Sequence, residues 1–196
     1  PHGHFRDWYT RADSESPTPR RGDLLLFGQI RPYKGIEPLL EVFRALSADV
    51  GLHLTIAGAT SDPDLHRKIA DAADGSPHIS ASLRFLSDDE LVQKIVGSHM
   101  IVLPYSRMLN SGAALTALSL GRPVLVPRNA VNEALRNEVG STWVHMYDPP
   151  LTREDIEGAI DRAPLSAILR SAPSLGGRDW DSIANAHTDV YLGLGR

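Results

Sequence analysis

Apolar and polar stretches alternate along this chain at a regular spacing. The apolar run Leu24 to Phe27 is followed, from Ile36 to Leu46, by apolar residues three or four positions apart. A short continuous apolar run is typical of a buried strand, and apolar residues at the second spacing indicate an amphipathic helix. The pattern therefore predicts a strand followed by a helix that covers it.

The same alternation repeats through the rest of the chain. Because strands that alternate with helices through short connections build a parallel sheet, we expect a doubly wound, Rossmann-like α/β fold of six strand–helix units. Ser87 with Glu90, and Thr152 with Asp155, have the spacing of capping boxes at two helix starts. The further expected elements are strands at 52–57, 83–85, 100–103 and 124–126, and helices at about 62–73, 91–96 and 113–120.

Both ends of the chain differ from this central region. Residues 10–23 are polar and contain two prolines, so burial cannot offset the cost of ordering them. Near the other end, Trp180, His187 and Tyr191 fall on one face of an expected helix. We therefore expect a junction and linker at 1–23, one α/β domain at 24–176, and a C-terminal helix at 177–196. The aromatic stripe of that helix packs either back on the chain's own sheet or on a missing domain.

Composition narrows the class of protein. The chain has 196 residues and a formal net charge of −4, the wrong sign for attracting nucleic acid by charge. It contains no cysteine, which excludes a disulfide framework, a thiolate metal site and a cysteine nucleophile. Its apolar runs are far shorter than the ~20 residues of a membrane span. These observations indicate a cytoplasmic globular protein with no membrane span.

One loop has the composition of an anion site. Gly28 and Gly35 bound the segment after the first strand, and Arg31 and Lys34 precede the next helix. In open parallel sheets, ligands bind beyond the carboxyl ends of the strands, where helix N-termini favour anions. Neither the dinucleotide fingerprint nor the nucleoside-triphosphate loop is present. Ordinary surface charge is the alternative interpretation of the two cations.

A second loop could complete such a site. Ser111, Gly112 and Ala113 stand where the chain enters an apolar helix, and their small side chains would let a ligand reach the backbone amides. Simple helix capping is the alternative. Asp62 and Asp64, and Asp179 and Asp181, match a metal-binding Asp-x-Asp pattern but stand at expected helix starts, where capping explains them. A zinc site at His2 and His4 is not favoured.

Taken in order, these motifs resemble those of a known family. The chain is similar to the C-terminal, donor-binding half of GT-B glycosyltransferases of the family-four-like group, also called glycosyl transferases group 1. The likeness covers nearly the whole chain, including the junction at Pro1–His4 and the final helix at Trp180–Tyr191. The matching motifs are Gly28-x-x-Arg31-x-x-Lys34-Gly35, Ile56-Ala57-Gly58, Leu103-Pro104-Tyr105, Ser111-Gly112, Gly121-Arg122-Pro123-Val124 and Glu133.

The resemblance implies a set of site residues. Arg31 and Lys34 would contact the diphosphate of a nucleotide sugar, a GDP- or UDP-sugar, without a metal or other cofactor. The amides of Ser111, Gly112 and Ala113 would hold the phosphate oxygens. The residues implied near the nucleotide or sugar are Gly28, the Phe85–Leu86 region and Glu133.

The chain also departs from the common pattern of the group. Two glutamates eight positions apart usually precede the Gly-x-Pro-Val segment, and here Met108 and Thr116 stand at those positions. A subset of the group has Pro-Tyr and then Ser-Gly instead, and this sequence resembles that subset. The sugar hydroxyls that are held, and whether transfer retains or inverts the anomeric centre, stay open.

The expected function follows from the resemblance. The chain would be the donor-binding half of a hexosyltransferase that moves a sugar from a nucleotide-diphosphate sugar to an acceptor hydroxyl. The acceptor site and the catalytic residues would belong to a missing N-terminal half, so we expect the chain alone to be inactive. Peripheral attachment of the full-length enzyme to a membrane is left open. The alternatives are a GT-B-like sugar-nucleotide epimerase, a phosphorylase, or a non-enzymatic nucleotide-binding or regulatory module.

Overall fold

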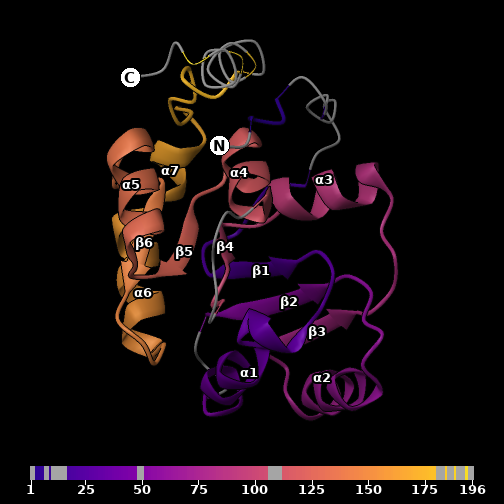
Figure 1. Cartoon of the computed structure of the whole chain (residues 1–196). Helices are drawn as coiled ribbons and strands as arrows, with labels where there is room; N and C mark the ends of the chain where they lie inside the picture. The colour runs from indigo at the N-terminus through magenta and orange to yellow at the C-terminus, as the bar shows by residue number, and fades with distance from the viewer. Residues whose placement is uncertain are drawn as a thin grey trace.

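The chain folds around one parallel β-sheet (Figure 1). The computed structural model describes residues 3–6, 9, 17–47, 51–105, 112–179, 184, 188 and 193. Within these ranges six strands pair in the order β3-β2-β1-β4-β5-β6, and every pair is parallel. This confirms the expected doubly wound fold. The strands are β1 Asp23–Phe27, β2 His53–Ala57, β3 Ile79–Ser82, β4 Met100–Val102, β5 Val124–Pro127 and β6 Val144–Tyr147.

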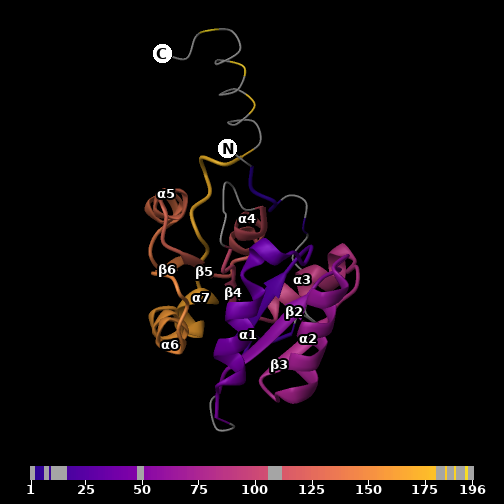
Figure 2. The same cartoon turned by 60° about the horizontal axis from the view of Figure 1, so that its bottom comes forward.

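Helices cover both faces of the sheet. In Figure 1, α3 and α4 lie above the sheet and α1 and α2 lie below it, and Figure 2 shows α5 and α6 on opposite sides of β6. None of the helices in the described ranges is long and apolar enough to cross a membrane. The helices are the 3₁₀ turn η1 Pro32–Lys34, α1 Ile36–Arg44, α2 Pro63–Gly75, α3 Asp88–Val96, α4 Gly112–Ser119, α5 Ala130–Val139, α6 Arg153–Arg162 and α7 Leu165–Ile168.

The core lies between the sheet and these helices, as the apolar pattern predicts. Leu24–Phe27 of β1 is fully buried, and the apolar stripe of α1 packs against the same core. Residues 114–119 of α4 are all buried, so this helix is enclosed on every side. Both expected capping boxes are present, at Ser87 before α3 and at Thr152 before α6.

The strand expected at 83–85 is a wrong prediction. The third strand is Ile79–Ser82, and Phe85 lies beyond it with its side chain 82% exposed. Because β3 is an edge strand, it needs no continuous apolar run. Instead its Ser80 hydroxyl hydrogen-bonds to the Thr55 hydroxyl of β2 at 3.1 Å. Because two of its four residues are serines, β3 does not form an apolar run and could not be predicted from one.

The N-terminal segment lies beside residues 173–178. His4 N donates to the Arg178 carbonyl at 2.7 Å, and an Arg6 nitrogen donates to the Pro173 carbonyl at 2.5 Å. Phe5 N donates to the Ser119 hydroxyl at 2.9 Å, at the last residue of α4. The segment 3–6 is thus tied to both α4 and the 173–178 segment. The aromatic stripe Trp180, His187 and Tyr191 lies outside the described residues, and the expected division of the chain at 23 and 176 stays a prediction.

Candidate anion-binding site

The sheet order has its topological switch point between β1 and β4, where folds of this kind form a ligand-binding crevice. The chain runs from β1 outward to β3 on one side and from β4 outward to β6 on the other, so the direction of winding reverses between them. Ligands of open α/β sheets bind at the carboxyl ends of the strands at this point. The loop after β1 and the segment after β4 are the first residues on either side of it.

These two segments are packed against each other at Gly35. Its φ is +64°, and a Cβ on this residue would stand 2.0 Å from the Pro104 carbonyl oxygen. Only glycine therefore fits here, since any side chain would clash with backbone. The close approach fixes the short turn η1, and with it Lys34, next to Tyr105.

Lys34 is buried at the end of β1. The residue is only 6% exposed, and its Nζ donates a hydrogen bond to the Phe27 carbonyl at 3.1 Å. The same Nζ stands over the Tyr105 ring, 5.0 Å from its centroid. Burial, with a smaller contribution from the positive charge of Arg31, lowers the pKa of Lys34 to about 8. Among the described residues, no carboxylate forms an ion pair with this ammonium.

Arg31 and Gly28 lie in the same loop. Arg31 is exposed, and its guanidinium donates to the Gln29 side-chain oxygen at 2.7 Å. Gly28 has a φ of +88°, and a Cβ on it would stand 3.3 Å from the Lys34 Nζ. The structure thus brings together three of the residues that the sequence indicated, two of them cations.

Tyr105 is the part of this site that the sequence analysis did not assign a role. It is 6% exposed, its hydroxyl has no hydrogen-bond partner among the described residues, and burial raises its pKa. The edge of the Tyr33 ring packs against it, with centroids 6.0 Å apart and planes at 78°. The Leu103-Pro104-Tyr105 motif was the available signal, but an aromatic residue after a buried strand is also typical of core packing.

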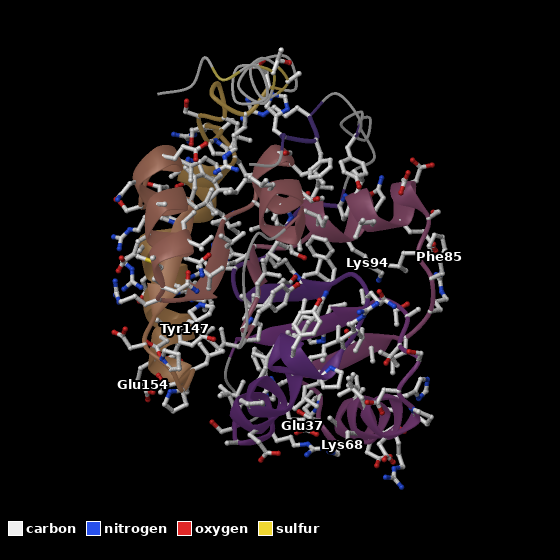
Figure 3. The ribbon with its side chains drawn as sticks, in the orientation of Figure 1. Glu37, Lys68, Phe85, Lys94, Tyr147 and Glu154 are labelled. Carbon is white, nitrogen blue, oxygen red and sulfur yellow. The ribbon has the colours of Figure 1, made fainter. Side chains whose placement is uncertain are left out.

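The other expected site residues are more scattered. Gly112 and Ala113 open α4, both partly buried, where helix amides lack intrahelical acceptors. Ser111 lies outside the described residues. Leu86 packs partly buried against the core on the loop after β3, where Phe85 projects outward (Figure 3). Glu133 is exposed in the first turn of α5.

Glu133 belongs to a small network of exposed charges beyond β5. Its carboxylate stands 3.8 Å from the Arg128 guanidinium, which also pairs with Asp148 at 2.9 Å. The same arginine borders a groove of about 540 Å³ along β6, together with Arg136, His145 and Arg162. This groove lies at the edge of the sheet, two strands away from β4, so it is distinct from the β1–β4 crevice.

Two side chains of the types that could ligate a metal, Asp62 and His99, serve structural roles. Asp62 accepts hydrogen bonds from Asp64 N and Leu65 N and so caps α2. His99 is fully buried, accepts from Gly22 N and lies 2.6 Å from the Ala163 carbonyl through its other nitrogen. Within the described ranges, no three acidic or histidine side chains gather as a metal site would require.

Comparison with known proteins assigns this fold and loop arrangement to a family of sugar-transferring enzymes. The family model described as glycosyl transferases group 1 matches residues 21–161, and the chain belongs to that family. It is 39% identical over 191 residues to two proteins of Xanthomonas campestris pv. campestris, each named GDP-mannose:glycolipid 4-beta-D-mannosyltransferase. The match covers 97% of this chain and 54% of each relative, so the chain spans about half the length of these relatives.

Solved structures show the same fold at low sequence identity. A glycosyltransferase involved in avilamycin A biosynthesis superimposes with a TM-score of 0.64 at 16% identity, over 97% of this chain and 57% of that one. The catalytic domain of starch synthase IV from Arabidopsis thaliana gives a TM-score of 0.62 at 12% identity, over 96% of this chain and 41% of that one. These matches confirm the GT-B type of α/β fold.

Proposed function

We propose that this chain is the donor-binding half of a glycosyltransferase that moves a mannosyl group from GDP-mannose to an acceptor hydroxyl. The observation that carries the proposal is the buried Lys34 ammonium at the carboxyl end of β1, which pairs with no carboxylate among the described residues. A buried cation is costly unless an anion accompanies it, and a diphosphate supplies that charge. The relatives named for GDP-mannose support GDP over UDP.

Each group in the crevice then has a role in the reaction. As the bond between the sugar and the diphosphate breaks, negative charge builds up on the departing phosphate oxygen. Cations and amides that are already in place stabilise that charge without reorganising. We assign this role to Lys34, Arg31 and the amides of residues 111–113, with Gly28 letting the ligand approach. Because the two cations neutralise the phosphates, the proposal requires no metal.

We further propose that a second half positions the acceptor, which the names of the relatives suggest is a glycolipid. Holding two reactants in place can lower a barrier by roughly 7 to 11 kcal/mol. The chain alone lacks that contribution and should transfer no sugar. No observation on the described residues favours an epimerase, a phosphorylase or a regulatory module.

A nucleotide screen tests the proposal. Isothermal titration calorimetry of the chain with GDP, UDP and ADP should give the tightest binding for GDP. The double variant Arg31→Ala/Lys34→Ala should bind GDP on the order of a hundredfold more weakly, because charge-assisted hydrogen bonds contribute roughly 1.5 to 3 kcal/mol each.

The matched control is Arg67→Ala/Lys68→Ala. It removes the same two residue types from the exposed face of α2, where Lys68 pairs with Glu37 of α1 (Figure 3). It should bind GDP like the wild type, since the net charge changes equally while Arg31 and Lys34 stay in place. If no nucleotide binds at millimolar concentration, or if both double variants bind alike, the proposal is wrong.

A further inference from the structure

Three aromatic and charged side chains form a stack beside the proposed phosphate position. The Tyr33 ring, 43% exposed, packs edge-on against the buried Tyr105 ring, which in turn faces the Lys34 ammonium. Edge-to-face packing holds a ring in one orientation, and a ring face attracts a cation. The stack therefore joins η1 to the end of β4 through a cation–π contact.

The hydroxyl of Tyr105 adds no hydrogen bond to this arrangement within the described residues. It is buried without a hydrogen-bond partner among the described residues, which for packing alone is unfavourable compared with phenylalanine. What the side chain does supply is the ring face 5.0 Å from the Lys34 Nζ.

Among the described residues, little else near Lys34 favours its charged form. The Phe27 carbonyl accepts one hydrogen bond from it, while Arg31 in the same loop repels it. On the neighbouring α4, residues 112–119 include no titratable side chain. In α1, Glu37 is engaged with Lys68 at the surface. The Tyr105 ring is thus the main favourable contact of the ammonium besides one carbonyl.

We propose that Tyr105 is a positioning residue of the donor site, whose ring face keeps the Lys34 side chain charged and in place for the diphosphate. The inference rests on the proposed function, because it assumes that Lys34 binds the phosphates. In this proposal the ring face of Tyr105 stabilises the ammonium, and the hydroxyl has no part in it. This stabilisation also gives the tyrosine three positions after β4 a role in the binding site as well as in the core.

The pH dependence of GDP binding separates this role from simple packing. In the wild type, affinity should fall above pH 8 as Lys34 loses its proton. Tyr105→Leu keeps the surroundings apolar but removes the ring face, which should lower the pKa of Lys34 by roughly one unit. Tyr105→Phe keeps the ring and should retain the wild-type profile. Titration of GDP itself is common to all the proteins and cancels in their ratio.

The experiment is calorimetry with GDP at pH 6, 7, 8 and 9 for the wild type and both variants. The ratio of the dissociation constants of Tyr105→Leu and Tyr105→Phe should grow about tenfold from pH 6 to pH 9. Tyr105→Met replaces the leucine variant if that one does not fold. If the ratio stays constant with pH, Tyr105 acts by packing alone and its ring face does not affect the pKa of Lys34. That result overturns the inference.

Lys34→Met distinguishes failure of this inference from failure of the proposed function. If Lys34→Met binds GDP as tightly as the wild type does, the proposed function is wrong. If Lys34→Met binds weakly while both Tyr105 variants follow the wild-type pH profile, only the role of Tyr105 is wrong.

Discussion

Lys34→Met removes the buried charge while keeping a long unbranched side chain, and we expect it to stabilise the fold. The pKa of Lys34 falls from 10.5 to about 8 in the folded chain. At roughly 1.4 kcal/mol per pKa unit, retaining the charge costs about 3 kcal/mol relative to the neutral amine. The variant also loses the hydrogen bond to Phe27 and the contact with Tyr105, roughly 1 kcal/mol each. A net gain of about 1 kcal/mol at pH 7 follows.

The stability of the wild type should also depend on alkaline pH in a way that the variant's does not. Between pH 8 and 10.5 the folded chain has released the Lys34 proton while the unfolded chain still holds it. Since the unfolded state then binds more protons, wild-type stability rises with pH across this window. The stability difference between variant and wild type should therefore shrink or reverse by pH 10.

Urea denaturation followed by tryptophan fluorescence at pH 7 and pH 10 measures both effects. A gain of about 1 kcal/mol corresponds to a rise in the urea midpoint of roughly 0.3 to 1 M, since m is about 1 to 3 kcal/mol/M. Lys68→Met, on the exposed face of α2, is the control and should show neither effect. If Lys34→Met is instead destabilised by more than about 1 kcal/mol at pH 7, Lys34 is a structural group and the reasoning is wrong.

Two other predictions concern metals and acid. GDP affinity should be unchanged in EDTA because Arg31 and Lys34 carry the required charge, and a tenfold or larger loss measured by calorimetry would show that a metal takes part. Burial lowers the pKa of His145 from 6.5 to about 4, so between these pH values the unfolded chain binds a proton that the folded chain does not. The free energy of unfolding should therefore fall by roughly 3 kcal/mol as the pH drops from 6.5 to 4. In urea titrations at pH 7 and 4.5, His145→Gln should reduce this loss and the exposed His66→Gln should not; equal acid sensitivity in both would contradict the assignment.

Much of the fold could be predicted from the sequence because most strands are buried on both faces. Leu24–Phe27 and Val124–Val126 appear as apolar runs since helices cover them above and below. The exceptions are the two edge strands. The edge position of β3 lets Ser80 and Ser82 stand in a strand, and β6, which includes His145, is not among the expected strands. An apolar pattern reports burial, and it fails where a strand is only partly buried.

The site could be predicted only in part, for a different reason. Arg31 and Lys34 stand out because glycines flank them within one loop, a local signal. Lys34 is buried against Tyr105 because β1 pairs with β4. These two strands are about 75 residues apart in the chain, so no local sequence pattern could predict the contact. Likewise, Glu133 could be placed after β5 from its motif, but its pairing with Arg128 could not.

The hydrogen bond from Phe5 N to the Ser119 hydroxyl connects the N-terminal segment to the last residue of α4. The helix has eight residues, about 12 Å of length, and is enclosed by core on all sides beyond its first turn. Because bending so short a helix would break its own hydrogen bonds and the packing around it, its two ends are held in a fixed relation to each other. The contact of the segment 3–6 with Ser119 therefore anchors the same helix that presents the amides of Gly112 and Ala113 at its other end.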